Sequence, residues 1–153
     1  MSIFLGRRNG RGLSDGEIEY CVRAWNILCG KDQKTLVLDE ARLDRSSTRF
    51  VEYLNLVYLG ADAYPGEGFS ANSRMSVLAC LAHELSHAQR FARGYRRPLE
   101  MPDVLIDEAE ASLDASFHQA LRPKDREDLR EDARDRLTDW LAGQSNLGEI
   151  SWT

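Results

Sequence analysis

Apolar residues recur at the three- and four-residue spacing of an amphipathic helix in four stretches of the chain. We expect these helices at about 15–28, 70–93, 104–121 and 124–142. The first follows a capping-box pattern, in which Ser14 precedes Glu17 by three positions. Ser70 or Ser73 is expected to cap the second helix, and Asp103 the third. The pattern therefore predicts a mostly helical protein.

Two short aliphatic runs lie between the first and second helical stretches and are bounded by polar turns. They predict strands at Lys34–Asp39 and at about Asn55–Gly60, the second of which ends before a Pro-Gly turn. The polar residues 40–50 are expected to connect them. Together the elements predict an α+β fold: one domain over residues 1–153, with a small sheet of two or three strands packed on the second helix.

The two ends of the chain lack this periodicity. Residues 6–16 contain four glycines and three arginines, so we expect residues 1–13 to form a flexible basic arm. Residues 144–153 follow the last predicted helix as a tail. The sequence shows neither the apolar core of a secretory signal nor a run long enough for a membrane span.

Composition adds a few limits. With 153 residues, of which 42% are hydrophobic and 29% charged, the chain is long enough for one domain with a core. A net charge of −5 predicts no general attraction to nucleic acid or to an anionic membrane. Three cysteines without a Cys-x-x-Cys pair predict reduced thiols and a cytoplasmic protein. These cysteines are Cys21, Cys29 and Cys80.

The second predicted helix carries the pattern His83-Glu84-Leu85-Ser86-His87. Positions four apart share one helix face, so His83 and His87 can direct two imidazoles at one metal ion. This H-E-x-x-H pattern is typical of zinc peptidases, in which the glutamate is the general base. Apolar residues before the motif place it on a buried helix, where unpaired polar groups are costly. The sequence therefore predicts a metal site on this helix.

A catalytic zinc site needs a third protein ligand. No histidine follows His87 at the spacing of the metzincin pattern. The acidic stretch on the third predicted helix instead offers Glu108 and Glu110. Glu108 shares a helix face with small residues that would allow close approach, whereas Glu110 shares a face with larger apolar residues. Both remain candidates, with Glu108 favoured.

At this point the two helices and their connection resemble the gluzincin metallopeptidases, in which a glutamate on a following helix completes a His-His-Glu set. Two registers compete. Glu108 to Ser112 is similar to the E-x-x-A-D/N pattern of ImmA/IrrE-type metallopeptidases, with Ser112 where that family has Asp or Asn. Glu110 to Asp114 is similar to the thermolysin-like E-x-x-x-D spacing, in which Asp114 would orient His83.

The resemblance implies a minimal zincin-like domain that binds Zn²⁺ and hydrolyses peptide bonds of a protein or peptide substrate. It implies His83, His87 and either Glu108 or Glu110 as ligands, with Glu84 as general base.

The transition state of peptide hydrolysis also needs a donor for the oxyanion. Tyr95, just after the motif helix, is the first candidate, and Arg96, Arg97 and His118 are the others. An extended substrate is expected along the strand at Asn55–Gly60.

Two other classes of function compete with the peptidase. A non-catalytic binding or regulatory module could share the same scaffold, with the departure at Ser112 in its favour. A metal hydrolase acting on a substrate other than a peptide is the third possibility. Glu84 beside His83 favours catalysis, because a purely structural metal site needs no base.

Overall fold

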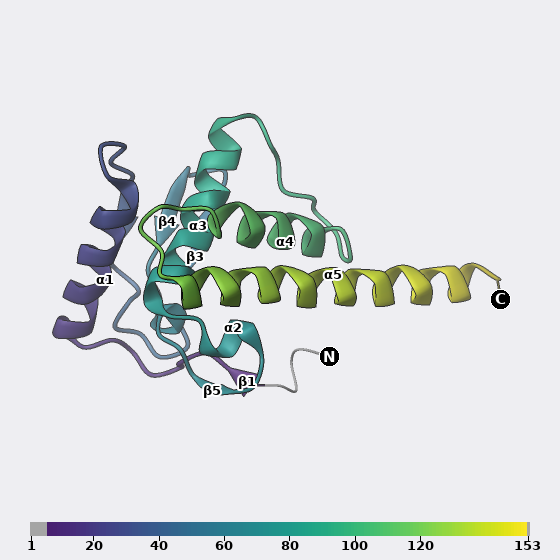
Figure 1. Ribbon diagram of the computed structural model, residues 1–153, viewed down its shortest axis with the longest axis horizontal. Helices are drawn as coiled ribbons and strands as arrows, with labels where there is room; N and C mark the ends of the chain where they lie inside the picture. Colours follow the sequence, from purple (N-terminus) through teal and green to yellow (C-terminus); the bar gives the residue numbers. More distant parts are fainter. Residues whose placement is uncertain (1–5, 153) are drawn as a thin grey trace.

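A computed structural model describes residues 6–152, and the side chains of residues 7–144 (Figure 1). The predicted α+β class is confirmed. In chain order the elements are β1 (Gly6–Arg7), α1 (Asp15–Cys29), β2 (Leu36–Val37), β3 (Arg49–Val51), β4 (Leu56–Tyr58), η2 (Ala61–Ala63), β5 (Glu67–Gly68), α2 (Ala71–Arg74), α3 (Val77–Ala92), α4 (Val104–Ala115) and α5 (Pro123–Trp152). None of these helices is long and apolar enough to cross a membrane.

The main sheet has the order β2-β4-β3. Central β4 runs parallel to β2 and antiparallel to β3, so Val57 lies opposite both Leu36 and Phe50. Asn55, with φ of 53°, makes the tight turn between β3 and β4, a left-handed conformation that Asn tolerates better than most residues. The sequence did not predict β3, because its residues lie at the edge of a stretch that reads as a polar connection.

Helix α3 is the central helix of the fold (Figure 1). Its apolar face contributes Leu81, Ala82 and Leu85 to the core, all almost fully buried. Helix α1 and the sheet pack against this helix, and α4 covers the face that carries the motif. The capping box predicted at the start of α1 is present, since Ser14 and Glu17 exchange hydrogen bonds.

Helices α4 and α5 run antiparallel, side by side, and α5 extends beyond α4 (Figure 1). The first turn of α5 is tied to the start of α3. There the Ser76 hydroxyl donates to Asp125 over 2.7 Å, and the same hydroxyl caps α3 by accepting from the Ala79 amide. This contact fixes where α5 crosses the motif helix.

The single helix predicted from Ser70 or Ser73 is two helices. Ser70 caps only the short α2, in which Ser73 is an internal residue. Met75 is extended, with ψ of 138°, and Ser76 caps α3. The second serine cap, at Ser76, lies six residues after the first and starts a new helix. The spacing of apolar residues alone does not reveal this break.

The third predicted helix ends at Ala115 rather than near residue 121. The turn that follows puts the His118 ring against the end of α1, where its Nε2 donates to the Leu28 carbonyl over 2.7 Å. Asp103 precedes α4 but makes no cap, and its carboxylate instead accepts from Trp140. Both departures arise from contacts between distant segments.

The arm predicted to be flexible is structured from residue 6 onward. Strand β1 pairs with β5, with Arg7 opposite Glu67. A Cβ on Gly66 would lie 1.8 Å from the Arg7 carbonyl oxygen, so the close approach of these segments requires glycine. Residues 1–5 of the predicted arm lie outside the described part. The predicted tail continues α5 as far as Trp152.

Candidate metal centre

The two motif histidines lie on the buried face of α3 that α4 covers. Their side chains are only 6% exposed. His83 and His87 are one helical turn apart, and their Nε2 atoms lie 3.2 Å from each other. Small residues on α4, including Ala111 and Ser112, are fully buried and let the two helices approach closely.

Glu108 projects from α4 between the two histidines. Its Oε2 is 3.1 Å from His83 Nε2, and its Oε1 is 3.0 Å from His87 Nε2. Two imidazole nitrogens from α3 and the two oxygens of one carboxylate from α4 therefore converge at hydrogen-bond distances. The structure brings Glu108 to the histidines.

The distances within this group fit a zinc ion. Two donors at 2.0–2.1 Å from a tetrahedral Zn²⁺ are about 3.3 Å apart, close to the separations found between these three side chains. Two imidazole nitrogens and one carboxylate are also a donor set typical of catalytic zinc. The residues present therefore fit the metal, with Glu84 nearby.

Ser112 determines which His83 nitrogen carries a proton. The Ser112 hydroxyl lies 2.7 Å from His83 Nδ1 and 2.6 Å from a carboxylate oxygen of Asp132. A hydroxyl has one proton, and an ionised carboxylate only accepts, so Ser112 donates to Asp132 and accepts from His83 Nδ1–H. Neutral His83 then has a lone pair on Nε2, facing His87 and Glu108. A cation, either a proton or a metal ion, is needed between His83 Nε2 and the carboxylate.

Asp107 lies behind the second histidine. One of its oxygens is 3.5 Å from His87 Nδ1, and this oxygen is a buried atom without a hydrogen-bond partner. Arg90 of α3 holds the other oxygen over 3.4 Å. If the His87 ring moved slightly closer to Asp107, its Nδ1–H could donate to this oxygen. Nε2 would then be directed inward, as it is in His83.

Two guanidinium groups approach the Glu108 carboxylate from outside. Arg97 reaches Oε1 over 2.6 Å, and Arg136 of α5 reaches Oε2 over 3.2 Å. Arg136 also donates to Asp132 over 2.8 Å, which closes a ring through Ser112 and His83. Burial alone would raise the pKa of Glu108, but its contacts with His83 and His87 hold that pKa well below its usual range.

Glu84 occupies the position next to His83 and faces the pocket. Its Oε1 accepts from the Phe50 amide of β3 over 3.2 Å. Burial raises the pKa of Glu84 to about 7, against the opposing effects of His87 and the Phe50 hydrogen bond. Strand β3 thus positions a carboxyl group that can both accept and release a proton near neutral pH.

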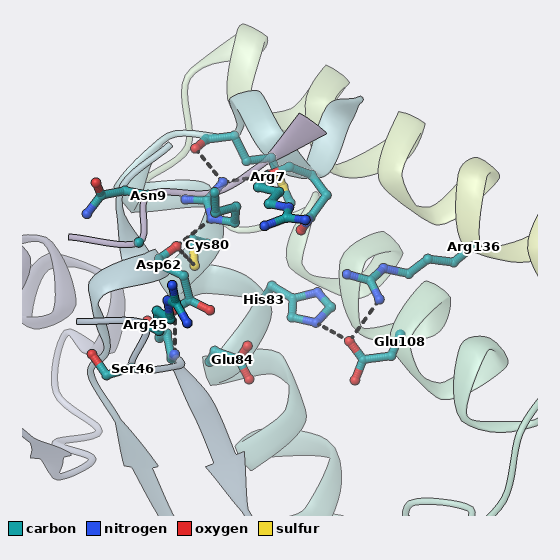
Figure 2. A pocket seen from close by; sticks show the side chains of 15 residues that line it. Arg7, Asn9, Arg45, Ser46, Asp62, Cys80, His83, Glu84, Glu108 and Arg136 are labelled. Atoms are coloured by element: carbon teal, nitrogen blue, oxygen red, sulfur yellow. Dashed lines mark hydrogen bonds and ion pairs between the residues drawn. The ribbon is translucent and has the colours of Figure 1, made fainter. Parts of the chain in front are cut away.

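Of these side chains, His83, Glu84, Glu108 and Arg136 line one pocket of about 580 Å³ (Figure 2). Glu108 and Arg136 reach it from α4 and α5, and Glu84 lies beside His83 on α3. Cys80 also lines the pocket, but burial raises the pKa of its thiol to about 12, so it is a neutral side chain there. All three cysteines are free thiols.

Glu110 lies away from the histidines. It is half exposed and pairs with Arg90 over 3.1 Å. Asp114, its partner in the thermolysin-like register, accepts from Ser86 over 2.6 Å rather than from His83. The geometry therefore agrees with the register in which Glu108 and Ser112 face the first histidine.

Tyr95 does not line the pocket. The residue is 54% exposed, and its ring stacks on the Arg90 guanidinium at 4.7 Å. Arg96 stacks on Phe91, and His118 is bound to the end of α1. Of the four candidate oxyanion donors, Arg97 alone contacts Glu108.

The strand edge expected to hold an extended substrate is not free. Strand β4, within Asn55–Gly60, is paired on both sides by β2 and β3. This prediction is wrong because the parallel partner β2, distant in sequence, takes the second edge of β4. Strand β3, at the end of the sheet, is the one that contacts Glu84.

Sequence reasoning missed Asp107, Asp132 and Arg136. The last two lie on α5, a helix whose many charges read as a solvated face. Asp132 and Arg136 are spaced four apart, which marks an ion pair on one face, but nothing local shows that this face is buried on α4.

Comparison with known proteins adds no relative: no family model matches the chain, and no curated protein or solved structure is significantly similar to it.

Proposed function

We propose that this protein is a zinc-dependent peptidase whose metal is held by His83, His87 and Glu108. One observation carries the proposal: the two Nε2 atoms and the Glu108 carboxylate converge within 3.0–3.2 Å, while Ser112 assigns the His83 proton to the opposite nitrogen. Two imidazole nitrogens and a carboxylate that converge in this way can share a proton or bind a metal ion, and they are the donor set of a catalytic zinc site. When bound there, Zn²⁺ supplies a Lewis acid that acidifies water and polarises a carbonyl.

Glu84 is the general base in this mechanism. Its Oε1 is held by the Phe50 amide, which leaves Oε2 to take the proton of the attacking water. The same oxygen then delivers the proton to the leaving amine nitrogen. Because Phe50 belongs to β3, an extended substrate lying along the edge of this strand would pass beside the base.

Arg97 and Arg136 position Glu108 from its outer side. Each carboxylate oxygen has two lone-pair directions, so a guanidinium and an inward-facing ligand bond can share it. Arg136 also lies on the pocket wall, where a cationic donor can stabilise negative charge that develops on a carbonyl oxygen.

The test compares wild type with Glu84→Gln and with the matched surface variant Glu110→Gln. Stoichiometric zinc, measured by atomic emission after dialysis, is expected in all three proteins. Casein cleavage is expected to fall by about 100- to 10,000-fold in Glu84→Gln alone. A wild type that binds no zinc, or a Glu84→Gln variant that cleaves as fast as wild type, contradicts the proposal.

A second candidate function is a non-catalytic binding module. It is favoured by the fact that Glu108 already pairs with Arg97 and Arg136, so the cluster closes on itself through ion pairs. Zinc-free protein with an unchanged unfolding midpoint in excess chelator would support this alternative over the peptidase.

A further inference from the structure

Four arginine side chains line the pocket that holds Glu84: Arg7, Arg8, Arg45 and Arg136. The protein as a whole carries a net charge of −5. Asp62, Glu84 and Glu108 line the same pocket, so its four guanidinium groups exceed its carboxyl groups by one. Arginines that no carboxylate neutralises can attract an anionic ligand there, because low-dielectric walls focus the field. The four guanidinium groups differ in the protein atoms that they already contact.

Arg136 and Arg8 are engaged within the protein. Arg136 pairs with Asp132 and Glu108. Arg8 donates to four backbone carbonyls, among them Ala63 over 2.7 Å and Met75 over 2.9 Å, and so pins the N-terminal segment to η2 and α2. Carbonyl oxygens satisfy its donors without cancelling its charge.

Arg7 and Arg45 are different. Both side chains are exposed, and neither makes a hydrogen bond, ion pair or ring contact with a side chain in the described part of the chain. Figure 2 shows them reaching the pocket from the N-terminal segment and from the connection before β3. Many arginines elsewhere in residues 7–144 do pair with carboxylates. These are Arg23, Arg42, Arg49, Arg74, Arg90, Arg93, Arg97 and Arg122.

The backbone at Arg45 has an uncommon conformation and is fixed by a hydrogen bond. Its φ is 62°, a left-handed conformation uncommon for a residue with a long side chain, and its amide donates to the Gly10 carbonyl over 2.7 Å. This bond ties the Arg45 turn to the segment that carries Arg7 and Arg8. Two separate segments are thereby joined into one arginine-bearing wall.

From this wall we propose that the pocket selects peptides with an aspartate or glutamate close to the cleaved bond, whose carboxylate binds Arg45 and Arg7. The inference rests on the proposed peptidase function. A guanidinium pairs with a carboxylate through two parallel hydrogen bonds, which gives both affinity and geometry. A nucleic acid is the poorer fit, because a chain of phosphates would also meet the acidic remainder of the surface.

The binding test uses zinc-loaded Glu84→Gln protein and two fluorescein-labelled peptides that differ only in Glu or Gln on either side of a central leucine. Fluorescence anisotropy is expected to show about tenfold or tighter binding of the Glu peptide, as for a charge-assisted hydrogen bond. Adding Arg45→Gln should bring the two affinities together. The control Arg23→Gln, a surface arginine on α1 paired with Glu19, should leave the difference unchanged.

Cleavage separates this inference from the function on which it rests. Wild type that cleaves the Glu and Gln peptides with equal kcat/KM retains the peptidase function and overturns the acidic preference. A protein that cleaves neither but binds the Glu peptide through Arg45 overturns the function and retains the binding preference. Equal or undetectable binding of the two peptides overturns the inference. The inference is also overturned if a labelled oligothymidylate binds more tightly than the Glu peptide does and this binding depends on Arg45.

Discussion

Two polar clusters contact α3, and they are built in opposite ways. At the N-cap, the Ser76 hydroxyl and two guanidinium N–H groups of Arg122 donate to the oxygens of Asp125, so each of these contacts has its own proton. At the centre, His83 Nε2 and the Glu108 carboxylate face each other, and Ser112 accepts from Nδ1–H on the far side of the ring. The first cluster is complete by itself, whereas the second needs either a proton or a metal ion between Nε2 and the carboxylate.

The difference shows how a buried polar cluster can be assigned a role. The N-cap cluster has a donor for each of these contacts, and its Arg122 side chain is 63% exposed. The cluster at the centre is buried and opens into a pocket through His83, Glu84 and Glu108. The two clusters thus differ both in burial and in whether every contact has its own donor.

The largest expected effect tests the metal directly. Glu108→Ala should weaken zinc binding by at least about 100-fold, because it removes one of the three proposed ligands and leaves Arg97 and Arg136 near the site. Competition with a fluorescent chelator measures this affinity. Glu110→Ala is the matched control and should bind zinc as wild type does. Loss of zinc in the Glu110 variant instead would reverse the assignment.

Zinc should also stabilise the fold. A metal that binds only the folded state adds about 2.7 kcal/mol to the free energy of unfolding at a free concentration 100 times its Kd. Urea titrations with and without zinc should show this increment in wild type and in Asp125→Asn. An increment of the same size in Glu108→Ala would place the metal elsewhere.

The hydrogen-bond chain behind His83 should contribute less than a ligand does. Asp132→Asn leaves a side chain of the same size but can offer Ser112 an amide donor in place of an acceptor. A loss of about 10- to 100-fold in zinc affinity is expected, as for other groups that orient a metal-binding histidine.

Asp128→Asn provides the control for Asp132→Asn, since Asp128 lies on the same helix but pairs with Arg74 and Lys124. Zinc affinity that falls equally in both variants would assign Asp132 only a structural role.

The N-cap cluster around Asp125 should affect folding stability and leave the metal site unchanged. Asp125→Asn should lower the free energy of unfolding by about 1–3 kcal/mol at pH 7 without changing zinc affinity. Burial tends to raise the pKa of Asp125, but hydrogen bonds from Arg122 and Ser76 lower it overall. A lowered pKa stabilises the fold above the unfolded value of about 3.9, and this contribution is lost as pH falls through the folded value.

The difference in urea stability between wild type and Asp125→Asn should therefore be constant near neutral pH and shrink below about pH 4. A difference that grows on acidification would contradict the lowered pKa.

Local signals account for much of the fold. The capping box at Ser14, the amphipathic stripe of α1 and the H-E-x-x-H spacing on α3 depend on neighbours within one or two turns, and each appears where the sequence predicts it. The preference for Glu108 over Glu110 also came from a local feature, the small residues on the same helix face. That face is the one that packs on α3.

Contacts between distant segments decided what the sequence left open. The break between α2 and α3, the central place of β4 and the early end of α4 all depend on partners far along the chain. The same is true at the centre, where Asp132 and Arg136 meet Ser112 and Glu108 only because α5 packs antiparallel to α4.

The sequence by itself determined which residues can hold a metal, because helical periodicity alone puts His83 and His87 on one face. Only the tertiary structure decided how that candidate metal centre is supported: a serine on α4 backed by a carboxylate on α5, and a pocket wall whose arginines come from the N-terminal segment and the turn at Arg45. The physical reason is that a hydrogen bond or a charge pair needs proximity in space, and local spacing supplies that proximity only within a single element.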